Sequence, residues 1–403
     1  MADIPVKIIS GHVTSARGFR AAGIHCGIKP QKRDLALVVA DAPAPAAGMF
    51  TTNRVKSPAV ILCQERIRSG RTQAIVVNSG NANTCTGPQG AADARETARL
   101  TAQHLGIAED LVLVASTGVI GIPLPMDAIR RGIPQAVQAL GPSGEEVAEA
   151  ILTTDSGPKT SAAQVEIEGK VVTVGGMTKG AGMIHPNMAT TLCFVTTDAA
   201  IEPRWLRVAL RRAVDRSYNR ISVDGDTSTS DTAVVMASGL AGHRTIAEDG
   251  EALRPFQAAL DAVMEALAKM VVRDGEGATK LVEIRVRGAA SDEDAHRAVS
   301  SVATSMLVKT AIYGGDPNWG RILMALGKSG AELVLERLRV AIGDVPVFTE
   351  GVGGAADLAK VEAVMRRKEV IIDVDLGLGA GQATMWTCDL SEEYVRINSA
   401  YMT

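Results

Sequence analysis

Short runs of apolar and β-branched residues recur along the chain and predict β-strands. Residues 165–175 alternate between apolar and polar positions around Glu168-Gly169, which is typical of a β-hairpin. The other predicted strands are Leu35–Ala40, Ala59–Cys63, Ala74–Asn78, Leu111–Ala115, Thr191–Thr197, Val282–Arg287, Leu333–Glu336, Arg339–Ala341, Val345–Thr349 and Glu369–Leu376.

Longer segments with apolar residues at helical spacing separate these strands and predict helices. They are Ala91–Leu105, Gly144–Leu152, Trp205–Arg216, Pro255–Val272 and Ser291–Tyr313. Strands and helices alternate irregularly, and several strands follow one another directly. This order favours a mixed α/β, layered fold over a simple doubly wound one. We expect one domain over residues 1–280 and a smaller C-terminal α/β domain over residues 281–403.

Composition narrows the class of protein. Of the 403 residues 46% are hydrophobic but only 3% are aromatic, so the core must consist mainly of aliphatic side chains. The net charge is -3 and no basic stripe occurs, which argues against a nucleic-acid partner. Apolar runs fall short of a membrane span, and the first residues lack the plan of a signal peptide. The five dispersed cysteines indicate reduced thiols and a cytoplasmic location.

The segment Lys179–Leu192 carries the most specific chemistry. A Gly-rich turn and a His-Pro-Asn break precede Ala189-Thr190, and an apolar strand follows. A threonine hydroxyl at such a junction can attack the preceding carbonyl and cut the chain. The freed Thr190 would then carry a nucleophile and, in its own α-amine, a general base with an unperturbed pKa of about 8. The ordinary alternative is that Thr190 merely begins a strand, as β-branched residues favour.

Two other segments suit the same chemistry. Ser116–Gly121 follows a predicted strand and offers a hydroxyl beside a glycine amide, the kind of donors that stabilise an oxyanion. Lys179 could bind a carboxylate, and Glu276 lies between glycines that allow a ligand to approach closely. Taken alone, each of these features is better explained by an ordinary turn or a solvated polar residue.

Several segments together resemble the ornithine acetyltransferase family, also called the glutamate N-acetyltransferase family. Besides Lys179–Leu192 they are Val76–Gly87, Ser116–Gly121, Thr153–Lys159, Asp224–Thr232, Gly275–Lys280, Lys309–Ile322 and Trp386–Leu390, and they occur in family order along nearly the whole chain. Two positions depart from the usual pattern: Ser230 stands where the family usually has Asn, and Ala400 replaces an acidic residue.

The resemblance implies an N-terminal-nucleophile-like sandwich that cleaves itself between Ala189 and Thr190. It implies Thr190 as the nucleophile, with the Thr117 side chain and the Gly118 amide as the oxyanion hole. The implied substrate-binding residues are Thr153, Lys179, Thr190, Glu276, Asn398 and Thr403. The implied reaction moves an acetyl group from N-acetylornithine to glutamate through an acetyl-Thr190 ester. No metal or cofactor is expected, although acetyl-CoA could be a second donor. The two fragments are expected to stay together as an α2β2 heterotetramer or larger assembly, without a nucleic-acid or membrane partner.

Two other functions use the same residues differently. An N-terminal-nucleophile hydrolase or aminopeptidase would pass the acyl group to water instead of an amine. A non-enzymatic assembly protein would leave the Ala189-Thr190 bond intact.

Overall fold

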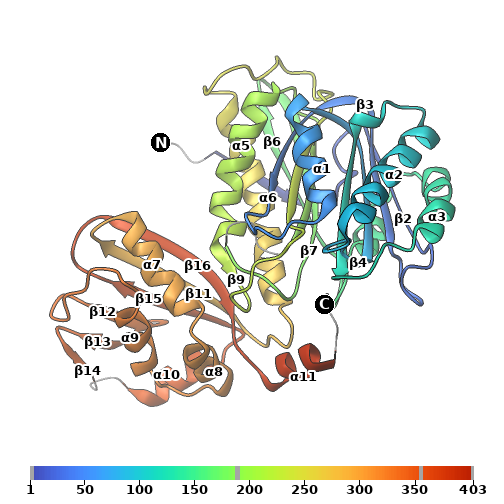
Figure 1. Ribbon diagram of the computed structural model, residues 1–403. Helices are drawn as coiled ribbons and strands as arrows, with labels where there is room; N and C mark the ends of the chain where they lie inside the picture. The colour runs from blue at the N-terminus through green and yellow to red at the C-terminus, as the bar shows by residue number, and fades with distance from the viewer. Residues whose placement is uncertain (1–3, 187–190, 354–356, 401–403) are drawn as a thin grey trace. The chain divides into compact units, whose positions relative to one another are not determined.

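The computed structural model describes residues 4–186, 191–353 and 357–400, which form two compact units with one sheet each (Figure 1). The first unit takes in the chain up to residue 219 together with residues 226–271, and the second takes in residues 220–225 and the chain from residue 272. The prediction of domains at 1–280 and 281–403 remains a prediction.

The first unit contains a nine-stranded sheet in the order β1-β6-β7-β8-β10-β3-β4-β5, with β2 paired to β3. Its strands are β1 (Lys7–Ile9), β2 (Phe19–Ile24), β3 (Leu35–Phe50), β4 (Arg71–Asn81), β5 (Val112–Val119), β6 (Lys159–Ile167), β7 (Lys170–Lys179), β8 (Leu192–Thr197) and β10 (Thr232–Ala237). The helices are α1 (Pro58–Arg66), α2 (Gly87–Leu105), α3 (Met126–Gln138), α4 (Glu145–Ala150), α5 (Pro203–Arg216) and α6 (Leu253–Arg273).

The long strand β3 joins two layers of this sheet. Its residues 35–40 pair with β2 and β4, whereas residues 46–50 pair with β10. The register with β4 shifts between Val39 and Ala44, where the strand passes from one layer to the other. Strands β2, β4 and β5 therefore form one layer with the start of β3, and β1, β6, β7, β8 and β10 form the second layer with its end.

Alternation along β3 explains how both faces of the first layer are buried. Residues 35, 37 and 39 pack in one apolar cluster with helices α1, α2 and α3, and residues 36, 38 and 40 pack in another with Met177, Leu192 and Phe194 of the second layer. A Cβ added at Gly176 on β7 would meet Val263 and Leu267 of α6, so α6 covers the outer face of the second layer. The unit is thus a helix–sheet–sheet–helix sandwich, which confirms the mixed α/β, layered prediction (Figure 1).

The second unit contains a seven-stranded sheet in the order β14-β13-β12-β15-β11-β16-β9. Apolar residues of α7, α8, α9 and α10 pack on one face of it around alternate residues of β11. The strands are β9 (Ile221–Ser222), β11 (Leu281–Ala289), β12 (Arg339–Ile342), β13 (Val345–Thr349), β14 (Val352–Gly353), β15 (Glu369–Asp375) and β16 (Gly381–Cys388). The helices are α7 (Asp292–Ala303), α8 (Met306–Gly314), α9 (Gly320–Gly327), α10 (Leu358–Met365) and α11 (Glu392–Ala400).

Two of the predicted strands are wrong. The apolar run Ala59–Cys63 lies in α1, because Ser57 caps this helix by accepting a hydrogen bond from the Ala59 amide and Pro58 occupies its first turn. Residues 333 and 334 have no regular structure and residues 335–337 form a turn, in which Leu335 is 55% exposed.

The predicted helix Ser291–Tyr313 is also wrong in its length. It is divided into α7 and α8, since α7 stops at Ala303 and Ser305 begins a new helix. The Ser305 hydroxyl accepts a hydrogen bond from the Val308 amide at 3.4 Å, which is the geometry of an N-cap.

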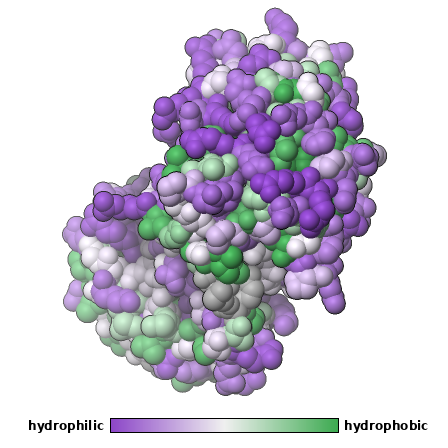
Figure 2. Space-filling model, turned by 45° about the vertical axis from the view of Figure 1, so that its right-hand side comes forward, coloured by the Kyte–Doolittle hydropathy of each residue, from purple (hydrophilic) through white to green (hydrophobic). Residues whose placement is uncertain are grey.

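Among the described residues, no helix combines the length and apolar character that a bilayer crossing requires. On the face shown in Figure 2, hydrophobic residues form separate patches among hydrophilic ones.

Candidate active site

The predicted cleavage site lies directly before β8. Ala189 and Thr190 lie outside the described residues, and the described chain resumes at Thr191. Thr191 is fixed by its backbone, because its carbonyl accepts a hydrogen bond from the Thr232 amide at 3.0 Å and its amide donates to Asp231 Oδ1 at 3.1 Å. The residue after the predicted nucleophile is therefore held at the entrance to the central pair of parallel strands, β8 and β10.

The predicted oxyanion residues lie at the end of β5. Ser79 and Gly80 of β4 pair in register with Thr117 and Gly118. Gly118 has a φ of 130°, and a Cβ added there would overlap the main chain of Gly80 and Asn81. Only glycine fits this position, because an L side chain would be both strained and in collision.

Lys179 at the end of β7 reaches across the sandwich to this strand. Its Nζ donates a hydrogen bond to Thr117 Oγ1 at 3.1 Å, and both residues are buried. The structure thus brings together two residues that are 62 positions apart in the sequence. This contact places a cation beside the predicted oxyanion donor.

Asp155 organises the surroundings of Lys179 and Thr153. One of its oxygens accepts hydrogen bonds from Lys159 Nζ at 2.6 Å and from the Gly180 amide at 2.7 Å, and the other accepts from the Thr153 amide at 3.0 Å. Burial opposes ionisation of Asp155, but the charges of Lys179 and Lys159 outweigh it and lower its pKa to about 2. Asp155 therefore remains a carboxylate that fixes the backbone at Thr153 and at the residue after Lys179.

A cavity too small to hold a water molecule lies between these elements in the first unit. Its lining consists of Thr117, Lys179, Thr191, Leu192, Ser228, Ser230 and Asp231. The candidate oxyanion residue Thr117, the candidate carboxylate-binding residue Lys179 and Thr191, which follows the predicted nucleophile, therefore all line the same cavity. Sequence reasoning did not single out Ser228 or Asp231, although both belong to the family-like segment Asp224–Thr232.

In the second unit, Glu276 and Asn398 form a direct contact. Asn398 Nδ2 donates to Glu276 Oε2 at 2.7 Å. The loop that carries Glu276 is fixed at Gly277, which has a φ of 69° and whose carbonyl accepts a hydrogen bond from Ser391 Oγ at 2.6 Å. Two predicted substrate-binding residues, far apart in sequence, are thus adjacent. Thr403 lies outside the described residues.

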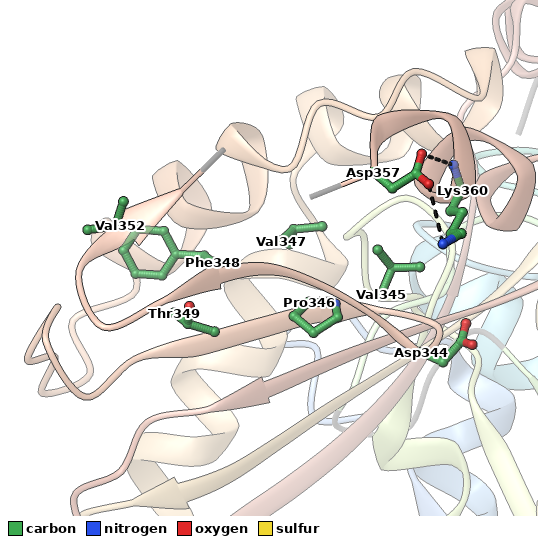
Figure 3. A pocket seen from close by; sticks show the side chains of 9 residues that line it. All are labelled: Asp344, Val345, Pro346, Val347, Phe348, Thr349, Val352, Asp357 and Lys360. Atoms are coloured by element: carbon green, nitrogen blue, oxygen red, sulfur yellow. Dashed lines mark hydrogen bonds and ion pairs between the residues drawn. The ribbon is translucent and has the colours of Figure 1, made fainter. Parts of the chain in front are cut away.

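A larger groove in the second unit contains none of the predicted site residues. It has a volume of about 420 Å³ and is lined mainly by β13 and the start of α10 (Figure 3). Its charged groups include Asp357 and Lys360, which pair with each other at 3.4 Å. The groove lacks a nucleophile beside a base, so we do not assign the reaction to it. Within the described ranges, His, Cys, Asp and Glu side chains form no group of three or more that could hold a metal ion.

Known proteins match this chain over almost its full length. Residues 20–403 match the ArgJ family. The arginine biosynthesis bifunctional protein ArgJ of Symbiobacterium thermophilum is 52% identical over 399 residues, covering 98% of this chain and 99% of that protein. The protein of the same name from Geobacter sulfurreducens is 51% identical over 393 residues, covering 96% of this chain and 100% of that protein.

A solved structure of ornithine acetyltransferase complexed with ornithine, from Mycobacterium tuberculosis, is 38% identical with a TM-score of 0.43 and covers 47% of this chain and 100% of that one. The family match and the full-length relatives agree with the motifs that carry the resemblance in the sequence. The chain therefore belongs to the ArgJ family.

Proposed function

We propose that this protein transfers the acetyl group of N-acetylornithine to glutamate, yielding ornithine and N-acetylglutamate, after cleaving itself between Ala189 and Thr190. The main support is the cavity that Thr191 shares with Thr117 and Lys179, because it places the chain next to Thr190 beside an oxyanion donor and a buried cation. Membership of the ArgJ family supports the substrate class, since its relatives are named for arginine biosynthesis.

Self-cleavage begins when the Thr190 hydroxyl attacks the Ala189 carbonyl. The acyl group moves from nitrogen to oxygen, the nitrogen gains the proton that the hydroxyl loses, and water hydrolyses the resulting ester. The new α-amine of Thr190 then acts as general base for the same hydroxyl. Activity therefore appears only after the bond has been cut.

In the transfer reaction, Thr190 attacks the acetyl carbonyl of N-acetylornithine. The Thr117 side chain and the Gly118 amide stabilise the oxyanion, and each such donor contributes about 3 kcal/mol. Ornithine leaves with the proton taken from Thr190. The glutamate amine then attacks the ester, the bond between the acetyl group and the Thr190 oxygen breaks, and that oxygen regains a proton from the amine. The resemblance gives Thr153, Lys179, Glu276, Asn398 and Thr403 as the residues that bind the charged ends of the two substrates. The chain supplies nucleophile and base itself, so we propose no metal or cofactor.

The fragments produced by cleavage are proposed to remain together in the cytoplasm. Strand β8 follows the cut, yet it lies between β7 and β10, and β10 in turn pairs with β3. Each fragment thus contributes neighbouring strands to one sheet, and separating them would break two ladders of backbone hydrogen bonds. The resemblance extends this pair to an α2β2 or larger assembly.

The test replaces Thr190 with alanine and follows acetyl transfer with both substrates varied. Wild-type protein should release ornithine continuously only when glutamate is present, and no more than one ornithine per site without it. Reciprocal plots at several glutamate concentrations should be parallel, as a two-step exchange requires. The Thr190→Ala chain should remain intact and inactive. A Thr190→Ala chain that still splits and transfers acetyl groups would refute the proposal, and repeated turnover of N-acetylornithine to ornithine without glutamate would favour a hydrolase.

One observation favours a second acetyl donor. The relatives carry the word bifunctional in their names. We therefore propose acetyl-CoA as an alternative donor to the same Thr190, with N-acetylornithine as the main one. Formation of N-acetylglutamate from acetyl-CoA and glutamate by wild-type protein, and its loss in Thr190→Ala, would support this. No product from wild-type protein would rule it out.

A further inference from the structure

Asp231 is a buried carboxyl group that the proposed reaction leaves without a role. It precedes β10 and is 1% exposed. Its Oδ1 accepts a hydrogen bond from the Thr191 amide at 3.1 Å, and its own carbonyl accepts one from the Thr51 amide at 3.1 Å. The side chain thus adds one hydrogen bond beyond the end of the β8–β10 ladder, on the side where Thr190 is attached.

The covalent chain links this hydrogen bond to the proposed nucleophile. The Thr191 nitrogen is bonded to the carbonyl carbon of Thr190, and the peptide unit between them is planar. Asp231 holds the nitrogen of that unit, while the Thr232 amide holds the Thr191 carbonyl at 3.0 Å. Main-chain groups on both sides of the Thr191 Cα are therefore fixed.

The second oxygen of Asp231 is different. Oδ2 is buried and has no hydrogen-bond partner among the described residues, and Asp231 lines the same cavity as Thr117 and Lys179. Burial raises the pKa of Asp231 well above its usual range, and the hydrogen bond from the Thr191 amide and the charge of Lys179 offset this only in part. An asparagine would keep the shape of this side chain and its accepting oxygen.

We propose that Asp231 is a positioning residue for Thr190, whose side chain fixes the Thr190–Thr191 peptide during self-cleavage and acetyl transfer. This inference rests on the proposed function. It requires a hydrogen-bond acceptor at residue 231 but no negative charge. Asp198 offers a matched comparison, because it follows the opposite end of β8 and is equally buried. Its side chain accepts a hydrogen bond from the Thr173 amide at 2.8 Å.

The test compares two replacements of nearly equal shape. Asp231→Asn keeps the acceptor, whereas Asp231→Leu removes it and fills the same space. Full-length chains are made by cell-free synthesis, the fraction split is followed on denaturing gels, and kcat is measured per processed chain. We expect Asp231→Asn to stay within about threefold of wild type. Asp231→Leu should process and turn over about 10-fold to 100-fold more slowly with little change in KM, because a small displacement of a nucleophile has effects of this size.

Thermal unfolding and Asp198→Leu provide the controls. Asp198→Leu should lower the melting temperature without slowing cleavage or kcat, and Asp231→Ala replaces Asp231→Leu if the latter does not fold. Equal rates for the Asn and Leu variants, fast or slow, would overturn the inference: a fast pair shows that no acceptor is needed, and a slow pair shows that the carboxyl itself is needed. Failure of the proposed function is separate, because it would appear as an unsplit wild-type chain.

Discussion

A buried aspartate binds the main chain near each end of strand β8, but the two side chains differ in how many of their oxygens accept hydrogen bonds. At the far end, both oxygens of the buried Asp198 are used, by the Thr173 amide at 2.8 Å and by Arg17 Nε at 2.8 Å. At the Thr191 end, Asp231 has one oxygen bound by the Thr191 amide and one without a partner in the described part of the chain. At one end of β8 the aspartate uses both of its oxygens in hydrogen bonds, and at the other end buried polar groups face a cavity.

We infer that the Asp198 end of β8 contributes to stability and that the Thr191 end contributes to the reaction. A buried polar atom without a partner costs free energy, and each such atom in a native structure calls for an explanation. Lys179, Thr117 and Asp231 all line the cavity at the Thr191 end. Changes at that end should therefore reduce activity, whereas changes at the Asp198 end should reduce stability alone.

The largest effect is expected from Gly118→Ala at the reactive end. An added Cβ would overlap the Gly80 main chain and displace the amide proposed as an oxyanion donor. Loss of one such donor costs about 10²–10³ in kcat. Gly121→Ala is the control, since Gly121 also has a positive φ, 83°, but an added Cβ meets nothing within 4 Å. Steady-state kinetics of acetyl transfer should separate the two, and similar kcat values would contradict this account of Gly118.

Asp155→Asn should have the next largest effect, and its effect should depend on pH. Removing this carboxylate takes away an anion that faces the buried Lys159 and Lys179, which costs about 3–5 kcal/mol of unfolding free energy at pH 7. The folded pKa of about 2 lies below the ordinary 3.8, so the stabilisation is complete above pH 3.8 and disappears as pH falls through about 2.

Denaturant unfolding at a series of pH values tests this prediction. The gap between wild type and Asp155→Asn should narrow by about 2 kcal/mol between pH 5 and pH 2. A gap that stays constant over this range would show that the carboxylate does not carry the stabilisation. Asp198→Asn is a suitable comparison. Its cationic partner Arg17 is 56% exposed, so water can solvate the Arg17 charge when the carboxylate is removed, and the loss of stability should be smaller.

The smallest effect is expected from Arg17→Met at the Asp198 end. The variant removes one partner of Asp198 and leaves that oxygen unpaired, which should cost about 1–3 kcal/mol. Self-cleavage and kcat should not change, because the substitution lies beyond the opposite end of β8 from Thr191. A fall in kcat at unchanged KM would show that the two ends are not independent.

The elements that were predicted correctly are those whose apolar residues repeat regularly, every second residue in a strand or at helical spacing in a helix. The hairpin around Glu168-Gly169 is present as β6 and β7, and the amphipathic helices at 205–216 and 255–272 are present as α5 and α6. Failures occurred where capping residues overrode the pattern, as at Ser57 and Ser305. Strand β10 was missed, although all six of its residues are buried, because it follows a long polar turn without alternation.

The candidate site was predictable to the extent that motifs carry it. Thr117 and Lys179 were named from motifs and are in contact, as are Glu276 and Asn398. Asp155 and Asp231 were not singled out, because an aspartate within a run of hydroxyl residues is typical of an ordinary turn. Their roles depend on burial and on partners 25 and 40 residues away, which only the fold brings together.

The most direct test of the central claim is the mass of the purified wild-type protein under denaturing conditions. If Thr190 acts as proposed, the spectrum contains two chains, residues 1–189 and 190–403, and Thr190→Ala contains one. The wild-type pair should also gain the mass of one acetyl group on the second fragment when N-acetylornithine is added without glutamate. A single intact wild-type chain that is active would contradict the account.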